Sequence, residues 1–290
     1  MSTRPTDGAL RHAALANGPA IAARHPEIFH QPLAQRLLGP AILALVLGLF
    51  AYSLMVLGFT FERVWNGLER LGYIVGYMLP PDPGRHFWKY FHALGETVAI
   101  ALLGTLLGAV MAVPLALLAA KNIIPNRLFH FGWRRGLDIF RAVDVLIWAL
   151  IWINVVGLGP FAGILAIALS DTGGFAKLFS EAIEAADRKP VEGVTAAGGG
   201  PAHGIRFGIL PQVFPIMISQ VLYYIESNTR SATIIGIVGA GGIGLHLSDT
   251  IRLNEWQNVS FLILMILVTV ALIDWISTRL RFAIIGRRGG

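Results

Sequence analysis

The sequence of 290 residues contains no cysteine and few charged residues. The absence of cysteine excludes disulfides, a thiol nucleophile and cysteine-based metal sites. Only 14% of the residues are charged, whereas 55% are hydrophobic, and soluble domains carry roughly 25% charged residues. Low-complexity tracts and repeats of roughly 20–50 residues are also lacking, which argues against a repeat array. The low share of charged residues and the high share of hydrophobic ones indicate that a lipid bilayer surrounds most of the chain.

Signatures of catalysis are scarce as well. The sequence has no G-x-x-x-x-G-K-[ST] motif and no Asp, Glu or His set with metal-ligand spacing, so we expect no bound cofactor or metal. Gly239, Gly241 and Gly244 do fit the G-x-G-x-x-G pattern of a dinucleotide-binding turn. However, fewer than about 50 residues follow, too few for the second half of such a fold. We therefore interpret these glycines, with Gly242, as closely packed, bendable backbone.

Long apolar segments without charged residues predict an all-α integral membrane protein, because a backbone in lipid must satisfy its own polar groups. We expect about six crossings, at roughly 37–58, 97–119, 138–156, 160–179, from about 207, and 257–280. The stretch "VVGLGP", Val155–Pro160, separates the third crossing from the fourth. Ser231–Leu247 is so rich in glycine that we expect a partial or re-entrant segment there.

The placement of basic residues predicts the orientation. With both termini in the cytoplasm, most of the 23 lysines and arginines fall on the inner side, as in other membrane proteins. This predicts a cytoplasmic tail over 1–36, a transmembrane domain over 37–290, an outer segment over 62–95 and inner loops over 121–141 and 181–206. The outer segment begins with apolar residues at helical spacing, which predicts a helix at the membrane interface.

One polar cluster stands in apolar surroundings. The stretch "YYIESNTRS" contains Glu226, Ser227, Asn228, Arg230 and Ser231, and Thr233 then begins "TIIGIVGAGGIG". Glu226 and Arg230 have the i, i+4 spacing of a helical ion pair. Ionisable groups at membrane depth usually face a partner or a watery cavity. Residues 226–250 are thus a candidate pathway or gate, although a purely structural pair or a solvated pair at the headgroups remains open.

The loop before residue 210 has the pattern of a known family. "VEGVTAAGGGPAHGIRFGILPQV" resembles the cytoplasmic loop of the permeases of binding-protein-dependent ABC importers, which carries Glu-Ala-Ala, a Gly six residues after the Glu, and Leu-Pro about twelve residues later. The positions that match are Glu192, Gly193, Val194, Gly198, Leu210 and Pro211. Gly193 and Val194 replace the two alanines, and Gly208 stands where the family usually has Ile. The literal "EAA" at Glu184 does not fit, because Pro190 lies six residues after it.

The resemblance becomes more specific downstream. "ESNTRSAT" followed by "VGAGGIG" resembles the phosphonate branch of these permeases, and the similarity covers about Thr97–Arg281. It implies a MetI-like fold with coupling helices, in a multi-pass protein of the bacterial inner membrane. It also implies a passage for a phosphonate or a related oxyanion such as phosphite or hypophosphite.

The same resemblance implies the partners. These are a second permease subunit (identical or a close paralogue), a periplasmic substrate-binding protein, and two cytoplasmic ATPase subunits that use ATP and magnesium and bind the Glu192–Gly198 loop. We expect no nucleic-acid partner and no enzymatic activity of the chain itself.

Within the passage, our hypothesis is that Arg230, with Ser227, Asn228 and Ser231, donates hydrogen bonds to the oxyanion while Glu226 orients Arg230. Three other functions stay open: an importer permease for an amino acid or osmolyte, a membrane-embedded nucleotide-binding enzyme, and a non-transporting scaffold.

Overall fold

The computed structural model describes residue 23 and residues 33–124 and 126–285, which form helices and connecting turns and contain no strand. The chain divides into two units, residues 1–72 and 73–290, and each is described by itself. Five described helices are long and apolar enough to cross a membrane, and one bent pair would make a sixth crossing. The prediction of an all-α membrane protein with about six crossings is confirmed.

The first unit contains α4 (Leu33–Val56) and the start of α5 (Phe61–Tyr77). Helix α4 matches the first predicted crossing, and α5 is the amphipathic helix predicted from its apolar spacing. Gly58, with φ of +62°, forms the turn between them, and Arg63 donates a hydrogen bond of 3.0 Å to its carbonyl. The predicted tail, residues 1–36, lies outside the described residues apart from residue 23 and the first turn of α4.

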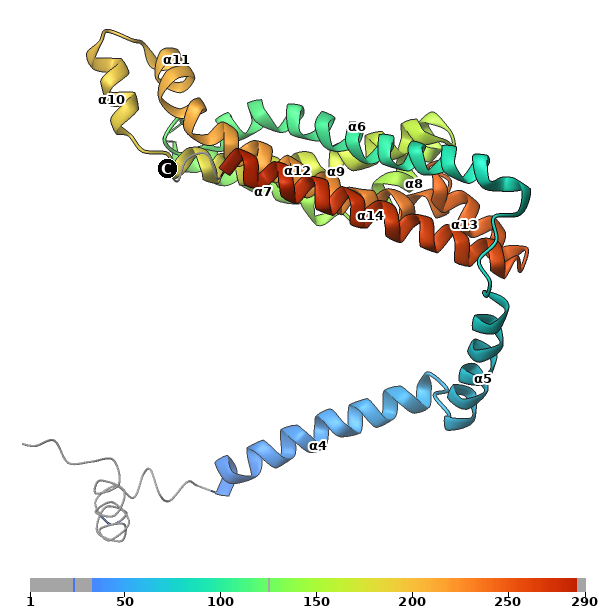
Figure 1. Ribbon diagram of the computed structural model, residues 1–290. Coiled ribbons are helices and arrows are strands. Elements are labelled where there is room, and N and C mark those ends of the chain that lie inside the picture. The colour runs from blue at the N-terminus through green and yellow to red at the C-terminus, as the bar shows by residue number, and fades with distance from the viewer. Residues whose placement is uncertain (1–22, 24–32, 125, 286–290) are drawn as a thin grey trace, which may run out of the picture. The chain divides into compact units, whose positions relative to one another are not determined.

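The second unit is a bundle of long helices, drawn from teal to red in Figure 1. Its four longest helices are α6 (Phe87–Ala119), α9 (Pro160–Glu184), α12 (Leu210–Ile237) and α14 (Trp256–Ile285). Glycines let α6 and α9 approach each other closely: a Cβ atom on Gly104 would lie 2.8 Å from the Cβ of Ile167, and one on Gly108 would lie 2.9 Å from the carbonyl oxygen of Ala168. Small residues serve this purpose in membrane helices generally.

The ends of these helices extend beyond the predicted crossings. Helix α6 begins at residue 87, whereas we predicted residue 97, because its first turns carry charged and polar residues that lower the hydropathy. For the same reason α9 ends at residue 184 instead of residue 179. The predicted boundary at "VVGLGP" is confirmed, since Gly157 and Gly159 have φ values of +91° and +134° and no helix continues through them.

The predicted third crossing at 138–156 is wrong as a single helix. The structure has α7 (Arg127–Ala142) and α8 (Val145–Val156), which meet at an angle of 81°. Asp144 causes this break: its side chain accepts a hydrogen bond of 2.8 Å from the backbone N–H of Leu146 and so caps the start of α8. We call Val143–Asp144 the break.

The break lies beside the middle of α9. A Cβ atom on Gly173 would lie 2.8 Å from the carbonyl oxygen of Leu137 and 3.2 Å from the backbone nitrogen of Arg141. Gly173 is the fourteenth of the 25 residues of α9. Arg141 therefore lies halfway along the bundle. Our prediction that it belongs to an inner loop is wrong.

Short elements close the two ends of the bundle. At one end, α10 (Lys189–Ala196), α11 (Pro201–His203) and the π-helical η2 (Gly204–Ile209) form a projection that we call the hairpin. At the other end, the 3-10 turn η1 (Gly84–His86) precedes α6, and α13 (Ile243–Arg252) lies between α12 and α14. The predicted partial segment Ser231–Leu247 is thus the last turns of α12, a tight turn and the start of α13.

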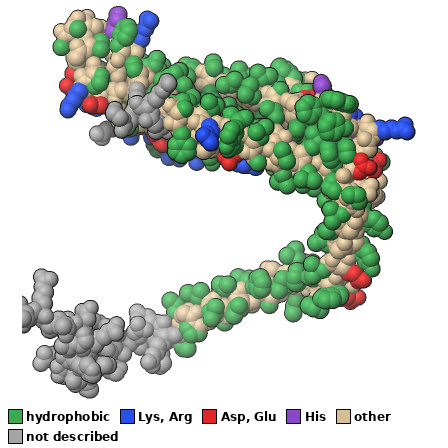
Figure 2. Space-filling model, in the orientation of Figure 1, with side chains coloured by type: hydrophobic (Ala, Val, Ile, Leu, Met, Phe, Trp, Pro, Cys, Tyr) green, Lys and Arg blue, Asp and Glu red, His purple; other side chains and the backbone are tan. Residues whose placement is uncertain are grey.

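Hydrophobic side chains cover most of the flank of the bundle that is visible in Figure 2, and charged side chains are most frequent near its ends. Leu103 of α6 and Leu267 and Val268 of α14, for example, are between 49% and 63% exposed in the isolated chain. Such a broad apolar surface fits a bilayer or a neighbouring membrane subunit.

Candidate functional site

The hairpin consists of two helical arms joined at Gly198. Its φ of +85° lies in the left-handed region that favours glycine, and the turn is closed by a hydrogen bond of 2.9 Å from the backbone N–H of Gly199 to the carbonyl of Val194. Glu192 lies exposed in the first turn of α10, where a carboxylate is favourable to the helix dipole. No residue of α10 is buried. Glu192, Gly193 and Val194 thus share one arm that has no buried residue, and Gly198 forms the joint at its end.

The structure explains why Gly208 stands where the resembling family usually has Ile. A Cβ atom at this position would lie 2.7 Å from Cγ2 and 3.0 Å from Cα of Val191 in α10. The two arms therefore pack backbone against side chain at this point. A residue as large as Ile would force them apart.

Gln212 in the first turn of α12 fixes the base of the hairpin. Its side-chain nitrogen donates to the carbonyls of Asp187 (3.0 Å) and Gly208 (2.7 Å), and its oxygen accepts from the backbone N–H of Asp187 (3.0 Å). Leu210 and Pro211, the last positions of the predicted motif, begin α12 directly after the hairpin. Movement of the hairpin would therefore be transmitted to α12.

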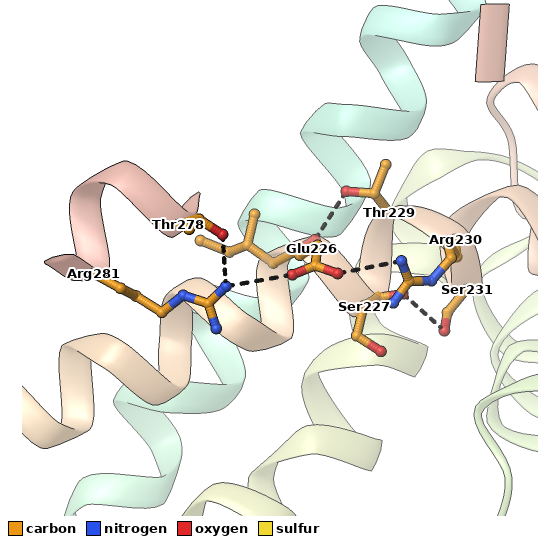
Figure 3. A network of polar contacts seen from close by, with 8 residues as sticks. Glu226, Ser227, Thr229, Arg230, Ser231, Thr278 and Arg281 are labelled. Carbon is orange, nitrogen blue, oxygen red and sulfur yellow. Dashed lines mark hydrogen bonds and ion pairs between the residues drawn. The ribbon is translucent and has the colours of Figure 1, made fainter. Parts of the chain in front are cut away.

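The polar segment Glu226–Ser231 lies past the midpoint of α12. Figure 3 shows Glu226, Arg230 and their neighbours from close by. Glu226 forms the predicted ion pair with Arg230 at 3.3 Å and a second pair, at 3.7 Å, with Arg281 of α14. Arg281 also donates a hydrogen bond of 3.1 Å to Thr278. The side chain of Glu226 is only 13% exposed, whereas that of Arg230 is 52% exposed. Glu226 thus connects two helices, and the cluster keeps one net positive charge.

Asn228 points away from this cluster. Its amide donates to the hydroxyl of Thr105 in α6 at 2.8 Å and to the carboxylate of Asp171 in α9, and all three residues are buried. This contact ties three helices together near their midpoints. Our hypothesis requires Asn228 to point in the same direction as Arg230. It does not, because successive residues of a helix point about 100° apart.

A polar cavity of about 370 Å³ lies next to the break. It is lined by Arg141 and Asp144 at the break, Asp171 in α9, and Ser227 and Ser231 in α12. Asn228 reaches its wall, but Arg230 is not among the lining residues. Our sequence reasoning missed Arg141 and Asp144. An Asp directly before a long apolar run is a common helix start, and that signal at "AVDVLIW" could have revealed the break.

The glycines after the polar segment are closely packed, as interpreted from the sequence. Gly239, Gly241 and Gly242 have φ values between +76° and +105°, and we call Val238–Gly242 the glycine turn. A Cβ atom on Gly242 would collide with the hydroxyl oxygen of Thr97, which also accepts a hydrogen bond of 2.8 Å from the backbone N–H of Ile243.

Thr233 of α12 and Gly244 of α13 form a second close contact, because a Cβ atom on Gly244 would overlap the carbonyl oxygen of Thr233. The glycine turn also lines a cavity of about 720 Å³ that is open at this end of the bundle.

A comparison with protein families identifies the chain. Residues 112–286 match the family described as "binding-protein-dependent transport system inner membrane component". The chain belongs to this family. The match includes the break, the hairpin, the polar segment and the glycine turn.

Individual relatives agree with this assignment. A putative phosphite transport system permease protein from Stutzerimonas stutzeri is 39% identical over 240 residues, which are 83% of this chain and 85% of the relative. A putative cryptic phosphonate transport system permease protein from Escherichia coli K12 is 50% identical over 117 residues, 40% of this chain and 96% of the relative. The solved structure of the MetNI methionine ABC transporter in an inward-facing conformation has a TM-score of 0.61 at 20% identity, and covers 68% of this chain and 97% of that chain.

These similarities confirm the predicted membership and the MetI-like permease fold. The chain is a multi-pass membrane component of an importer and not an enzyme, and ATP hydrolysis belongs to a partner ATPase. The family also implies a partner permease subunit and a substrate-binding protein. The alternative of a nucleotide-binding enzyme is thereby excluded, and the glycine turn needs no nucleotide.

Proposed function

We propose that this chain is the permease subunit through which a phosphonate, phosphite or hypophosphite enters the cell. The observation that carries this proposal is the polar segment with its excess positive charge past the midpoint of α12, in a bundle of mostly apolar helices. Glu226, Arg230 and Arg281 together have one uncompensated positive charge, and hydroxyl groups lie on the neighbouring face of α12. An anion is attracted to such a site, whereas a zwitterionic amino acid or a cationic osmolyte gains less. The names of the relatives point to the same class of cargo.

The hairpin is the proposed docking site for the ATPase. Glu192, Gly193 and Val194 lie in its α10 arm, Gly198 forms the joint that follows, and no residue of α10 is buried. A short helical arm of this kind can sit in a groove of a soluble partner. Because Gln212 links the hairpin to α12, ATP-driven movement of the partner would act on the helix that carries the polar segment.

The proposed orientation places the hairpin and both termini in the cytoplasm of a bacterial cell. Basic residues in and directly before the hairpin, including Arg188, Lys189 and Arg206, support this orientation, since cytoplasmic loops are enriched in Lys and Arg. The glycine turn and the cavity that it lines then form the outer gate, which faces the periplasmic binding protein. The two permease subunits are copies of this chain or close paralogues.

Uptake by the assembled complex tests the cargo. The permease, its ATPase and its binding protein are reconstituted in vesicles, and import is measured for phosphonate, phosphite and hypophosphite. Methionine and a quaternary amine serve as controls of the other cargo classes. We expect ATP-dependent import of at least one phosphorus oxyanion and of neither control. Import of only a control compound would refute the proposed cargo while leaving the family membership intact.

A further inference from the structure

The break cavity brings charged groups from distant parts of the sequence to the middle of the bundle. Arg141 and Asp144 come from the break, Asp171 from α9, and Ser227 and Ser231 from α12. Asp171 is the twelfth of the 25 residues of α9, so the cavity lies near half the length of this helix. Its volume of about 370 Å³ exceeds the roughly 30 Å³ that one water molecule occupies by about tenfold. A small tetrahedral anion and several waters fit in this space.

Arg141 differs from three other arginines of the bundle, each of which is paired with a carboxylate. Arg134 pairs with Glu184, Arg135 with Asp138, and Arg230 with Glu226. Within the described part of the chain no ion pair is formed by Arg141, and the residue is exposed.

A charged side chain at half depth is costly when it faces lipid, and such residues face a water-filled passage or a partner charge. An exposed guanidinium beside a polar cavity therefore indicates that this face of the bundle lines the passage.

We propose that the break cavity is where the cargo oxyanion rests during its passage, with Arg141 as its cationic ligand and the hydroxyls of Ser227 and Ser231 as additional donors. This inference rests on the proposed function and changes the identity of the principal cation from Arg230 to Arg141. The break contributes to the arrangement, because Val143 and Asp144 line the cavity together with Arg141, which lies just before the break in α7.

The chemistry of the cavity suits one kind of anion. A guanidinium can donate two parallel hydrogen bonds to two oxygens of a tetrahedral oxyanion. Ser227 and Ser231 are four residues apart and so project from the same side of α12. The carboxylate of Asp144 already caps α8, and that of Asp171 accepts a hydrogen bond from Asn228. Neither carboxylate forms an ion pair with Arg141, whose positive charge stays available.

The two carboxylates also select between anions. They repel a fully ionised oxyanion but can accept a hydrogen bond from a P–O–H group. The cavity is therefore suited to a singly charged oxyanion that keeps a P–O–H group, as a phosphonate or phosphite monoanion does. Sulfate has no such proton, so we expect the cavity to disfavour it. Hypophosphite, whose anion also lacks a P–O–H group, should use the cavity less well than phosphite.

The test measures the number of phosphite or phosphonate molecules imported per ATP hydrolysed in the reconstituted complex. This ratio separates pathway defects from loss of assembly or ATPase activity. Arg141→Gln should lower the ratio at least about tenfold, since the loss of a hydrogen bond to a charged group weakens binding by about this factor or more. Arg141→Lys keeps the charge but loses the bidentate geometry and should fall in between. Arg135→Gln is the matched control on the same helix, because Arg135 pairs with Asp138 and does not line the cavity.

Each outcome decides the proposal. A wild-type ratio for Arg141→Gln, or a loss seen only for Arg230→Gln, overturns the assignment of Arg141 while the proposed cargo stands. If neither Arg141 variant assembles, the double variant Ser227→Ala/Ser231→Ala decides: a lowered ratio supports the cavity, and an unchanged ratio refutes it. If the wild-type complex imports no phosphorus oxyanion, the proposed function fails, and this inference fails with it.

Discussion

Gly244 offers a strict test of the contact between α12 and α13. A Cβ atom at this position would overlap the carbonyl oxygen of Thr233 and lie 3.0 Å from Cα of Gly236. Close carbon–oxygen contacts in proteins are about 3.3 Å or longer. The substitution Gly244→Ala therefore has to move α13 away from α12, since the obstacle is backbone and cannot rotate away.

The energetic consequence follows from two opposing terms. Overpacking of a tight contact costs typically about 1–3 kcal/mol, and a rigid backbone obstacle places this site at the upper end. The shift also stretches the hydrogen bond of 2.8 Å between the backbone N–H of Ile243 and the hydroxyl of Thr97. Replacing glycine by alanine inside a helix returns about 0.5–1 kcal/mol. We expect a net destabilisation of about 2 kcal/mol, because overpacking outweighs the gain in helix propensity.

The assay compares thermal unfolding of the complex in nanodiscs for Gly244→Ala and Gly95→Ala. Gly95 lies within α6, and no atom lies within 4 Å of a Cβ built there, so this control should keep or slightly raise the wild-type unfolding temperature. Gly244→Ala should unfold at a clearly lower temperature and import less cargo. Equal unfolding temperatures and equal import for the two variants would show that α12 and α13 do not approach each other this closely.

Three further changes probe other parts of the chain. Gly198→Ala places a side chain at a φ of +85°, which should cost roughly 1 kcal/mol and weaken co-purification of the ATPase. The control Gly200→Ala, at a φ of −76° with open space around its Cβ, should not weaken it. Equal recovery of the ATPase with both variants would contradict the docking proposal. Asn228→Leu removes a buried donor of the Asp171 carboxylate and should cost about 1–3 kcal/mol, seen as a lower unfolding temperature; an unchanged temperature would refute the hydrogen bond. Glu226→Gln leaves two arginines without their counter-charge, so its unfolding temperature should be lowered most at low salt and partly restored at high salt; a salt-independent loss would argue against the ion pairs.

Hydropathy predicted which segments form membrane helices, because apolar length alone decides whether a helix can cross a bilayer. It did not predict where they end. The first ten residues of α6 and the last five of α9 contain polar and charged side chains, yet they remain helical because neighbouring helices support them. The break at Val143–Asp144 was missed for the opposite reason: apolar residues follow it without interruption, and a single capping Asp determines the geometry.

For the site, local pairs were predictable and distant ones were not. The pair of Glu226 with Arg230 follows from their spacing of four residues, and the structure contains it. The second partner, Arg281, lies 55 residues further along the chain, and nothing in the local pattern points to it. The contact of Asn228 with Asp171 is likewise a consequence of how α9 and α12 pack.

The geometry of α12 gives a physical reason why the E-S-N-x-R-S run is dense in polar residues. A polar side chain on a helix of a membrane bundle needs a partner in its own direction. Glu226 points toward α14, where it pairs with an arginine; Asn228 points toward α6 and α9; and Ser227 and Ser231 point toward the break cavity. Arg230 stays half exposed beside Glu226. The run therefore combines structural contacts, which hold the bundle together, with two serines on the cavity wall, to which we assign a passing ligand only as a proposal.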